Sequence, residues 1–144
     1  MKKKVNIGFT LKNIVTEQFA IIEESYTDKA DINLRTDIGF GIDKEKKLAK
    51  VHFKISLQCT DQPFLVLEIA TFFSIKPQSF ESFLSEDKTK LTLPANFAQH
   101  LGVITVGTAR GILHAKTEKT DFNKFFLPTI NLVELVKEDV AFNL

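Results

Sequence analysis

Apolar and polar residues alternate most regularly between Asp31 and Cys59. Every second residue is apolar or Thr, and the alternation resumes after a charged run at residues 44–47. Because side chains on a strand point alternately to opposite faces, this pattern predicts a β-hairpin with one buried and one solvated face. The apolar positions are Ile32, Leu34, Thr36, Ile38, Phe40 and Ile42, followed by Val51, Phe53, Ile55, Leu57 and Cys59.

The pairing register of this hairpin can also be predicted. A slip of one residue would turn a whole strand to the wrong face, so apolar residues must lie opposite apolar residues. Placing Phe40 opposite Val51 also places Ile38 on Phe53 and Leu34 on Leu57. On the solvated face, this register sets Asp37 against Lys54, whereas the next allowed register sets Arg35 against Lys54. We prefer the first, because like charges directly opposite each other repel.

Two further segments are predicted as strands. Residues 11–24 contain β-branched and aromatic residues and are followed by a polar connection at 25–30. A tight turn at residues 61–63 leads into residues 64–75, which are apolar on both faces apart from Glu68, Thr71 and Ser74. Such a strand should be covered on both sides. Four consecutive strands with short turns predict an antiparallel meander.

The second half of the chain changes to helical spacing. A short helix is expected at residues 78–85, a solvated loop at 86–90 and a long helix at 94–116. Gly102, Gly107 and Gly111 each cost this helix about 1 kcal/mol relative to Ala, and close approach of another helix would compensate. Local irregularity is the alternative, and we favour a subunit interface. The expected interface residues are Leu101, Ile104, Gly107 and Gly111.

The last segments are an unusual loop and a short helix. Residues 117–129 form a loop that contains Phe122, Phe125, Phe126 and Leu127, although surface loops are normally polar. Asn131 then caps a final helix, with Glu134 three residues later as in a capping box. Strands followed by helices, without βαβ alternation, indicate the α+β class, here as a single domain over residues 1–144.

Composition narrows the function classes. The net charge of +1 argues against nucleic-acid binding, and the basic run at Lys2–Lys4 is expected to be a solvated terminus rather than a binding arm. Polar residues interrupt any signal-peptide core, and no apolar run reaches the length of a membrane span. The single cysteine, Cys59, excludes an internal disulfide and favours a cytoplasmic protein. The 14 Phe residues, with one Tyr and no Trp, must be buried or presented to an apolar partner.

No residues form a credible catalytic set. His100 and His114 lie roughly 21 Å apart along the predicted helix, too far to share a metal ion. His52 lies among lysines on the solvated face, where an ordinary solvated histidine is expected. Cys59 is expected to be a buried structural residue. We therefore expect no enzyme activity, no metal site and no cofactor.

The chain resembles the SecB family of export chaperones. The resemblance spans the order of elements and is most specific in three runs: residues 93–98 (LPANFA), residues 105–112 (TVGTARGI) and residues 122–132, with Leu127-Pro128 and Ile130-Asn131-Leu132. The chain departs from the family at residues 106–110, where only the Ala109-Arg110 pair of the usual motif is kept.

The resemblance implies a fold and a function. Proteins of this family have a four-stranded antiparallel sheet, a long helix and a short terminal helix. They hold unfolded or nascent polypeptides without ATP, often for protein export, usually as a homotetramer built as a dimer of dimers. Glu68 matches one acidic position that docks the SecA motor, whereas Gln18 stands where an aspartate is expected, so the docking pattern for SecA is only partly matched.

A groove for client chains is expected near the Phe-rich loop. Ordinary core packing of this loop is an equally weighted alternative. A dedicated chaperone of one partner, such as an antitoxin, and a non-chaperone oligomeric scaffold stay open as functions. The expected groove residues are Phe72, Phe73, Ile75, Phe80, Phe83, Phe122, Phe125, Phe126 and Leu127.

Overall fold

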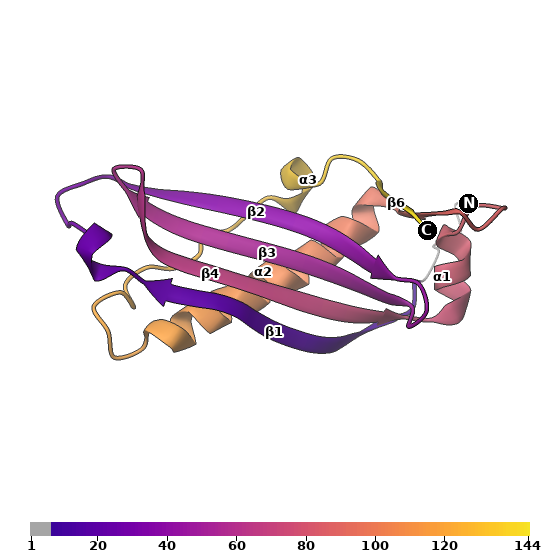
Figure 1. The fold of residues 1–144 in the computed structure, drawn as a ribbon, viewed down its shortest axis with the longest axis horizontal. Coiled ribbons are helices and arrows are strands. Elements are labelled where there is room, and N and C mark those ends of the chain that lie inside the picture. The colour runs from indigo at the N-terminus through magenta and orange to yellow at the C-terminus, as the bar shows by residue number, and fades with distance from the viewer. Residues whose placement is uncertain (1–6) are drawn as a thin grey trace.

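The computed structural model describes residues 7–144 (Figure 1), so the basic run at Lys2–Lys4 lies outside the described residues. A long four-stranded antiparallel sheet carries one long helix obliquely across one of its faces. The α+β prediction is confirmed. The elements are β1 (Phe9–Ile21), η1 (Glu23–Ser25), β2 (Ile32–Asp43), β3 (Leu48–Cys59), β4 (Gln62–Ile75), α1 (Pro77–Phe83), β5 (Lys90–Leu93), α2 (Ala95–Thr117), α3 (Leu132–Leu135) and β6 (Val140–Asn143).

The strand order corrects the predicted meander. The order is β1-β4-β3-β2, so only β2, β3 and β4 follow one another as hairpins, and β1 pairs with β4. This is a Greek-key arrangement. The connection at residues 22–31, which contains η1, is long enough to cross the width of two strands, each about 4.8 Å. The apolar character of β4 explains the order, because a strand with apolar residues on both faces is better placed inside the sheet than at its edge.

The predicted hairpin register is confirmed throughout. Phe40 pairs with Val51, Ile38 with Phe53, and Asp37 with Lys54. Every second residue of β3 from Ala49 to Cys59 is buried, while the residues between them are partly exposed. The alternation therefore reports the two faces of the sheet correctly.

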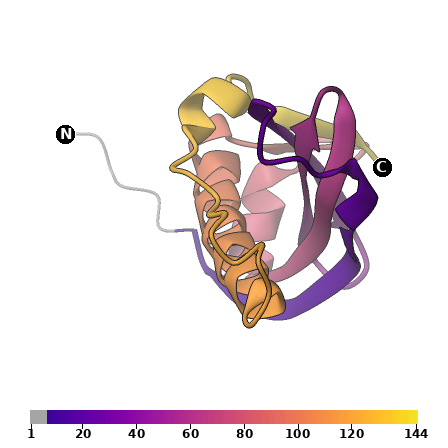
Figure 2. The same cartoon turned by 90° about the vertical axis from the view of Figure 1, so that its left-hand side faces the viewer.

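Within residues 7–144, no other element covers one face of the sheet. Figure 2 shows α2 on one side of the sheet, and the opposite side is open. The prediction that β4 is covered on both sides is therefore wrong for the face that carries Val66, Glu68, Ala70 and Phe72. Val66 and Ala70 are nevertheless buried, because β4 lies between β1 and β3 in the interior of the sheet.

The helix α2 begins one residue after the predicted start and packs its buried side onto β3 and β4. Phe97 and Leu101 belong to a core cluster at one end of the sheet, whereas Ala109 and Leu113 belong to a second cluster towards the other end. Gly102 allows a close approach, because a Cβ atom there would lie 2.6 Å from Cδ1 of Leu132. This contact brings the start of α3 against the middle of α2.

The C-terminal elements are only partly as predicted. Asn131 caps α3 by accepting a hydrogen bond from the Val133 amide at 3.1 Å, as its position before an apolar run predicted. The strand pair β5–β6 was not predicted. The expected loop at residues 86–90 gives way to β5 at Lys90, and β6 returns from α3 to pair with it. Both strands are too short for their alternation to be visible in the sequence.

A buried pair of hydroxyl groups joins the sheet to the helix. Oγ1 of Thr71 and Oγ1 of Thr105 lie 2.7 Å apart, and both side chains are fully buried. Oγ1 of Thr105 also donates to the carbonyl of Leu101 at 2.8 Å. Because Thr105 has only one hydroxyl proton, Thr71 must donate to Thr105. This bond ties β4 to α2 within the core.

The direction of this hydrogen bond predicts unequal effects of two similar substitutions. Thr105→Val removes the acceptor and leaves the buried Thr71 hydroxyl unsatisfied, so we expect a loss of about 1–3 kcal/mol of unfolding free energy. Thr71→Val leaves the Thr105 donor bond intact and should cost about 0.5–1.5 kcal/mol. The double variant should cost less than the sum of the two. Urea unfolding measures the free energy of unfolding of all three variants. A larger loss for Thr71→Val than for Thr105→Val would contradict the assignment of Thr71 as the donor.

Candidate functional site

The segment after α2 turns back and lies along one side of this helix; we call residues 126–136 the strap. Nε and Nη2 of Arg110 donate to the carbonyls of Leu127 and Pro128, each at 2.8 Å. Nε2 of Gln99 donates to the carbonyl of Val136 at 2.7 Å. The strap therefore runs antiparallel to α2. Figure 2 shows it in yellow beside the orange helix.

Apolar side chains of α2 and the strap form an exposed surface, which we call the apolar strip. Phe126 is 65 % exposed, Val133 62 % and Val103 55 %. The strip has two hollows beside it. One of about 180 Å³ is lined by Val103 and Ile130, and one of about 420 Å³ lies between β2 and the segment around Leu135. The residues of the strip are Val103, Phe126, Ile130, Val133 and Leu135.

The Phe-rich loop is mostly closed. Phe122 and Phe125 pack with Tyr26, which follows η1, and with Phe64 at the start of β4, at centroid distances of 5.2–6.0 Å. Phe122 is buried and Phe125 is partly buried. Phe126 instead turns outward and stacks on His114 at 6.2 Å. Core packing is therefore confirmed for Phe122 and Phe125, whereas Phe126 is exposed.

The other expected groove residues do not lie at this surface. Phe72 is on the open face of the sheet, where the ammonium group of Lys50 lies 5.8 Å from its ring centroid. Leu127, the second residue of the strap, is buried in the core cluster that also contains Phe122. Buried side chains are not accessible to a client in this structure, so the expected residues do not form one continuous exposed groove. The residues buried in the cluster at the other end are Phe73, Ile75, Phe80 and Phe83.

The expected interface residues fall into two groups. Leu101 is fully buried in the core of its own chain, so it is not available at an interface. Ile104 is partly exposed, and Gly107 and Gly111 are exposed with no heavy atom within 4 Å of an added Cβ. Gly107 and Gly111 lie on a side of α2 that neither the described strands nor the strap covers, and Ile104, at the edge of this side, also packs against the core cluster at one end of the sheet.

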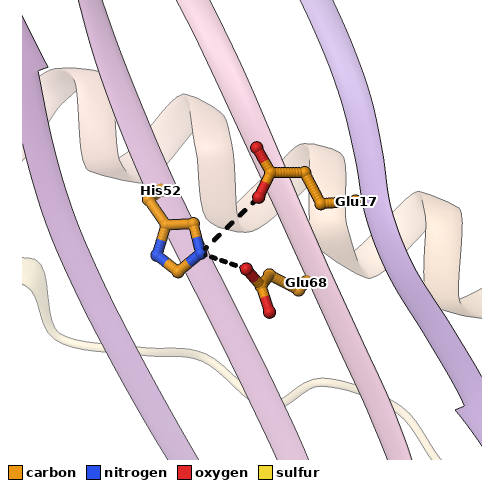
Figure 3. A group of neighbouring side chains, drawn as sticks. All are labelled: Glu17, His52 and Glu68. Atoms are coloured by element: carbon orange, nitrogen blue, oxygen red, sulfur yellow. Dashed lines mark hydrogen bonds and ion pairs between the residues drawn. The ribbon is translucent and has the colours of Figure 1, made fainter.

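The open face of the sheet carries a polar cluster that joins three strands (Figure 3). Nε2 of His52 on β3 lies 2.7 Å from Oε1 of Glu68 on β4 and 4.0 Å from Oε2 of Glu17 on β1. Oε1 of Glu17 also lies 3.6 Å from Nζ of Lys50. The hydrogen bond from His52 holds the pKa of Glu68 below its usual value, although partial burial acts in the opposite direction. Glu68 is therefore engaged within its own chain.

Sequence reasoning singled out Glu68 and His52 separately and missed Glu17. Glu17 reaches them because β1 pairs with β4, and because a β-bulge lies between Thr16 and Gln18. Thr16 and Phe19 are three residues apart and both face α2, whereas strict alternation would place them on opposite faces. In the sequence, the bulge is therefore visible only as a weak break in the alternation.

The geometry of the cluster predicts that the pKa of Glu68 depends on His52. His52→Ala should raise the pKa of Glu68 towards its ordinary value of 4.5, because the largest cause of the depression is removed. A depressed carboxyl pKa stabilises the fold above the unfolded-state pKa, and this contribution is lost as the pH falls through the folded-state value. Carboxyl NMR titration measures the pKa directly. Lys54→Ala is the control with a smaller effect, and equal shifts in the two variants would contradict the prediction.

Comparison with known proteins gives a match in fold. No protein-family model and no curated protein matches the chain. A solved structure of a SecB-like chaperone from Mycobacterium tuberculosis, in complex with a ChAD peptide from the HigA1 antitoxin, is similar with a TM-score of 0.52 and 10 % identity. The match covers 85 % of this chain and 90 % of that chain. At 10 % identity, this similarity shows a shared fold and nothing more specific.

A second structure has lower similarity. It is a protein of unknown function from Streptococcus agalactiae, with a TM-score of 0.37 and 13 % identity over 88 % of this chain and 100 % of that chain. Within the described residues, no helix combines the length and apolar character needed to cross a membrane.

Proposed function

We propose that this protein is an ATP-independent chaperone that holds unfolded polypeptides on its apolar strip. The observation that carries the proposal is the exposure of Val103, Phe126 and Val133 along α2 and the strap. Isolated apolar side chains are common on protein surfaces, but a run of them beside hollows is typical of a binding surface. The shared fold with a SecB-like chaperone that is seen with a bound peptide supports the same function.

The strip suits weak binding that tolerates many sequences. Each large apolar side chain that a client buries contributes about 1.5–3 kcal/mol, and part of this is lost to ordering the client. The strip residues are uncharged and select for apolar character, whereas charged side chains line part of the two hollows, Arg110 in one and Glu134, Lys137 and Glu138 in the other. Binding without nucleotide requires only that the strip stays exposed, and the Arg110 bonds to the strap backbone hold it in that position.

The proposal includes a homo-oligomer, with a dimer of dimers as the expected form. The uncovered side of α2 carries Ile104, Gly107 and Gly111, and Leu11 and Ile14 of β1 are 40 % and 43 % exposed. Leu11 and Ile14 pair with Phe73 and Thr71, so their side chains point towards the same side of the sheet as α2. A helix of a second copy would cover both surfaces, and the two glycines would allow a close approach.

A dedicated chaperone of one partner is a second candidate function. It is favoured by the peptide in the similar structure, which comes from an antitoxin. Pull-down with the intact protein distinguishes the two, because one dominant partner indicates dedication and many partners indicate general holding. Neither function requires docking to a SecA-type motor, and Glu68, the residue expected to dock it, is bound to His52.

An oligomeric scaffold is the rival from another class. It is favoured by the packing of Phe122 and Phe125 against Tyr26, which closes most of the Phe-rich loop. Binding of a dye that fluoresces on apolar surfaces distinguishes scaffold from chaperone. A negligible signal from the native protein would favour the scaffold.

The apolar strip predicts the effect of removing two exposed side chains. Phe126→Ser combined with Val133→Ser should weaken client binding about tenfold or more, because two apolar contacts of about 1.5–3 kcal/mol are lost. Suppression of aggregation of an unfolding client, at equal subunit concentrations, measures the effect. Val15→Ser is the matched control, since Val15 is exposed on the open face of the sheet. Equal protection by the double variant and the parent would show that the strip is not the client surface.

The uncovered side of α2 predicts the effect of filling its glycine positions. Gly107→Leu should fold as the parent does, because an added Cβ meets no atom of its own chain. The added side chain should separate the subunits, so sedimentation velocity should show a smaller species than the parent. Gly107→Ala is the milder control and should stabilise the helix by up to about 1 kcal/mol. A monomeric parent, or an unchanged assembly in Gly107→Leu, would contradict the proposed interface.

A further inference from the structure

The polar cluster on the open sheet face lies outside the apolar strip, so client binding does not account for it. Glu17, His52 and Glu68 each offer one ligand atom, and these atoms all lie within 4.8 Å of one another. They come from β1, β3 and β4, which are hydrogen-bonded neighbours in the sheet. In Figure 3 the Nε2 atom of His52 points between the two carboxylates. Three donor groups on three paired strands form a rigid frame.

The bulge in β1 brings Glu17 to this frame. Gln18 pairs with Glu68, and the register shifts between Thr16 and Gln18, which leaves Glu17 as the extra residue. In a regular strand Gln18 would point towards α2. The bulge instead places Glu17 and Gln18 on the open face and returns Phe19 to the core side, opposite Leu67. Bulges that redirect a side chain are frequent next to functional sites.

The distances between the donor atoms are close to those of a metal site. In a tetrahedral zinc site with bonds of about 2.0–2.2 Å, neighbouring ligand atoms lie about 3.3 Å apart. Nε2 of His52 is 2.7 Å from Glu68 and 4.0 Å from Glu17, so small rotations of two carboxylates would equalise them. The three side chains are 22–33 % exposed, which leaves room for an ion to enter and to keep a water ligand.

We propose that Glu17, His52 and Glu68 form a binding site for a divalent transition-metal ion, with Zn²⁺ as the first candidate. One imidazole and two carboxylates suit ions of borderline softness better than Mg²⁺ or Ca²⁺, which prefer oxygen ligands alone. The ion takes the position of the proton that His52 and Glu68 share. Three protein ligands leave a fourth position open, as in zinc sites that exchange their ligands.

The neighbouring charges set the character of the site. Lys50 contacts Oε1 of Glu17, whereas Oε2 of the same carboxylate faces His52, so one oxygen stays available to the ion. Lys54 pairs with Glu68 across the strands and lowers the negative charge of the cluster further. These lysines disfavour a tightly held structural ion. The site is therefore one for reversible binding, and folding does not depend on it.

Calorimetric titration of the intact protein with ZnCl₂ tests the proposal. We expect the parent to bind one ion per chain at this site, and His52→Ala and Glu17→Gln each to weaken binding at least tenfold. His114→Ala is the matched control, because His114 also lies beside a carboxylate, Glu118 at 3.4 Å, but in a pair rather than a triad. Circular dichroism should show that all variants remain folded.

Two results would overturn the proposal. One is a parent that does not bind Zn²⁺, and the other is a His52→Ala variant that binds as the parent does. A selective shift of the His52 ring signals in NMR spectra on addition of Zn²⁺ is the expected second readout, and a shift of His114 alone would place the ion elsewhere. The inference does not depend on the proposed function, since loss of Zn²⁺ binding and loss of client protection are measured separately.

Discussion

The structure depends on the burial of one face of β3 and β4 beneath α2. The largest fully buried side chains of these strands, among them Phe53, Ile69 and Phe73, point towards the helix. Hydrophobic burial has no preferred direction, so it is the hydrogen bond between Thr71 and Thr105 that adds a fixed register between sheet and helix. The strap, the strip and the uncovered side of α2 all take their positions from this helix. These three surfaces therefore follow from one packed layer.

Sequence reasoning succeeded where local pattern and structure coincide. The β2–β3 register followed from alternation and from one charge pair, Asp37 with Lys54, because neighbouring strands of a hairpin leave few alternatives. The strand order was missed because the length of the connection at residues 22–31 limits how far β2 can lie from β1, but it does not decide whether the two strands pair. The continuous apolar run of β4 contained the missing information, since an interior strand has two neighbours and an edge strand has one.

The candidate site was harder to predict than the fold. Phe122, Phe125 and Phe126 are chemically identical and nearly adjacent, yet one is buried, one is partly buried and one is exposed. Their positions are decided by Tyr26 and Phe64, which are distant in the sequence. Glu17 was missed for a related reason: the pairing of β1 with β4 and a bulge both had to be known before its carboxylate could be placed near His52.

The two edges of the sheet differ in a way that affects how it can grow. The pairing of β1 with β4 contains two register shifts, whereas that of β2 with β3 contains none. A strand added beside β1 would find the free backbone amides and carbonyls out of step at each irregular point. The edge at β2 keeps its regular spacing. The irregular pairing therefore obstructs continuation of the sheet into another chain at β1, whereas at β2 the backbone spacing is regular and β6 lies near part of the strand.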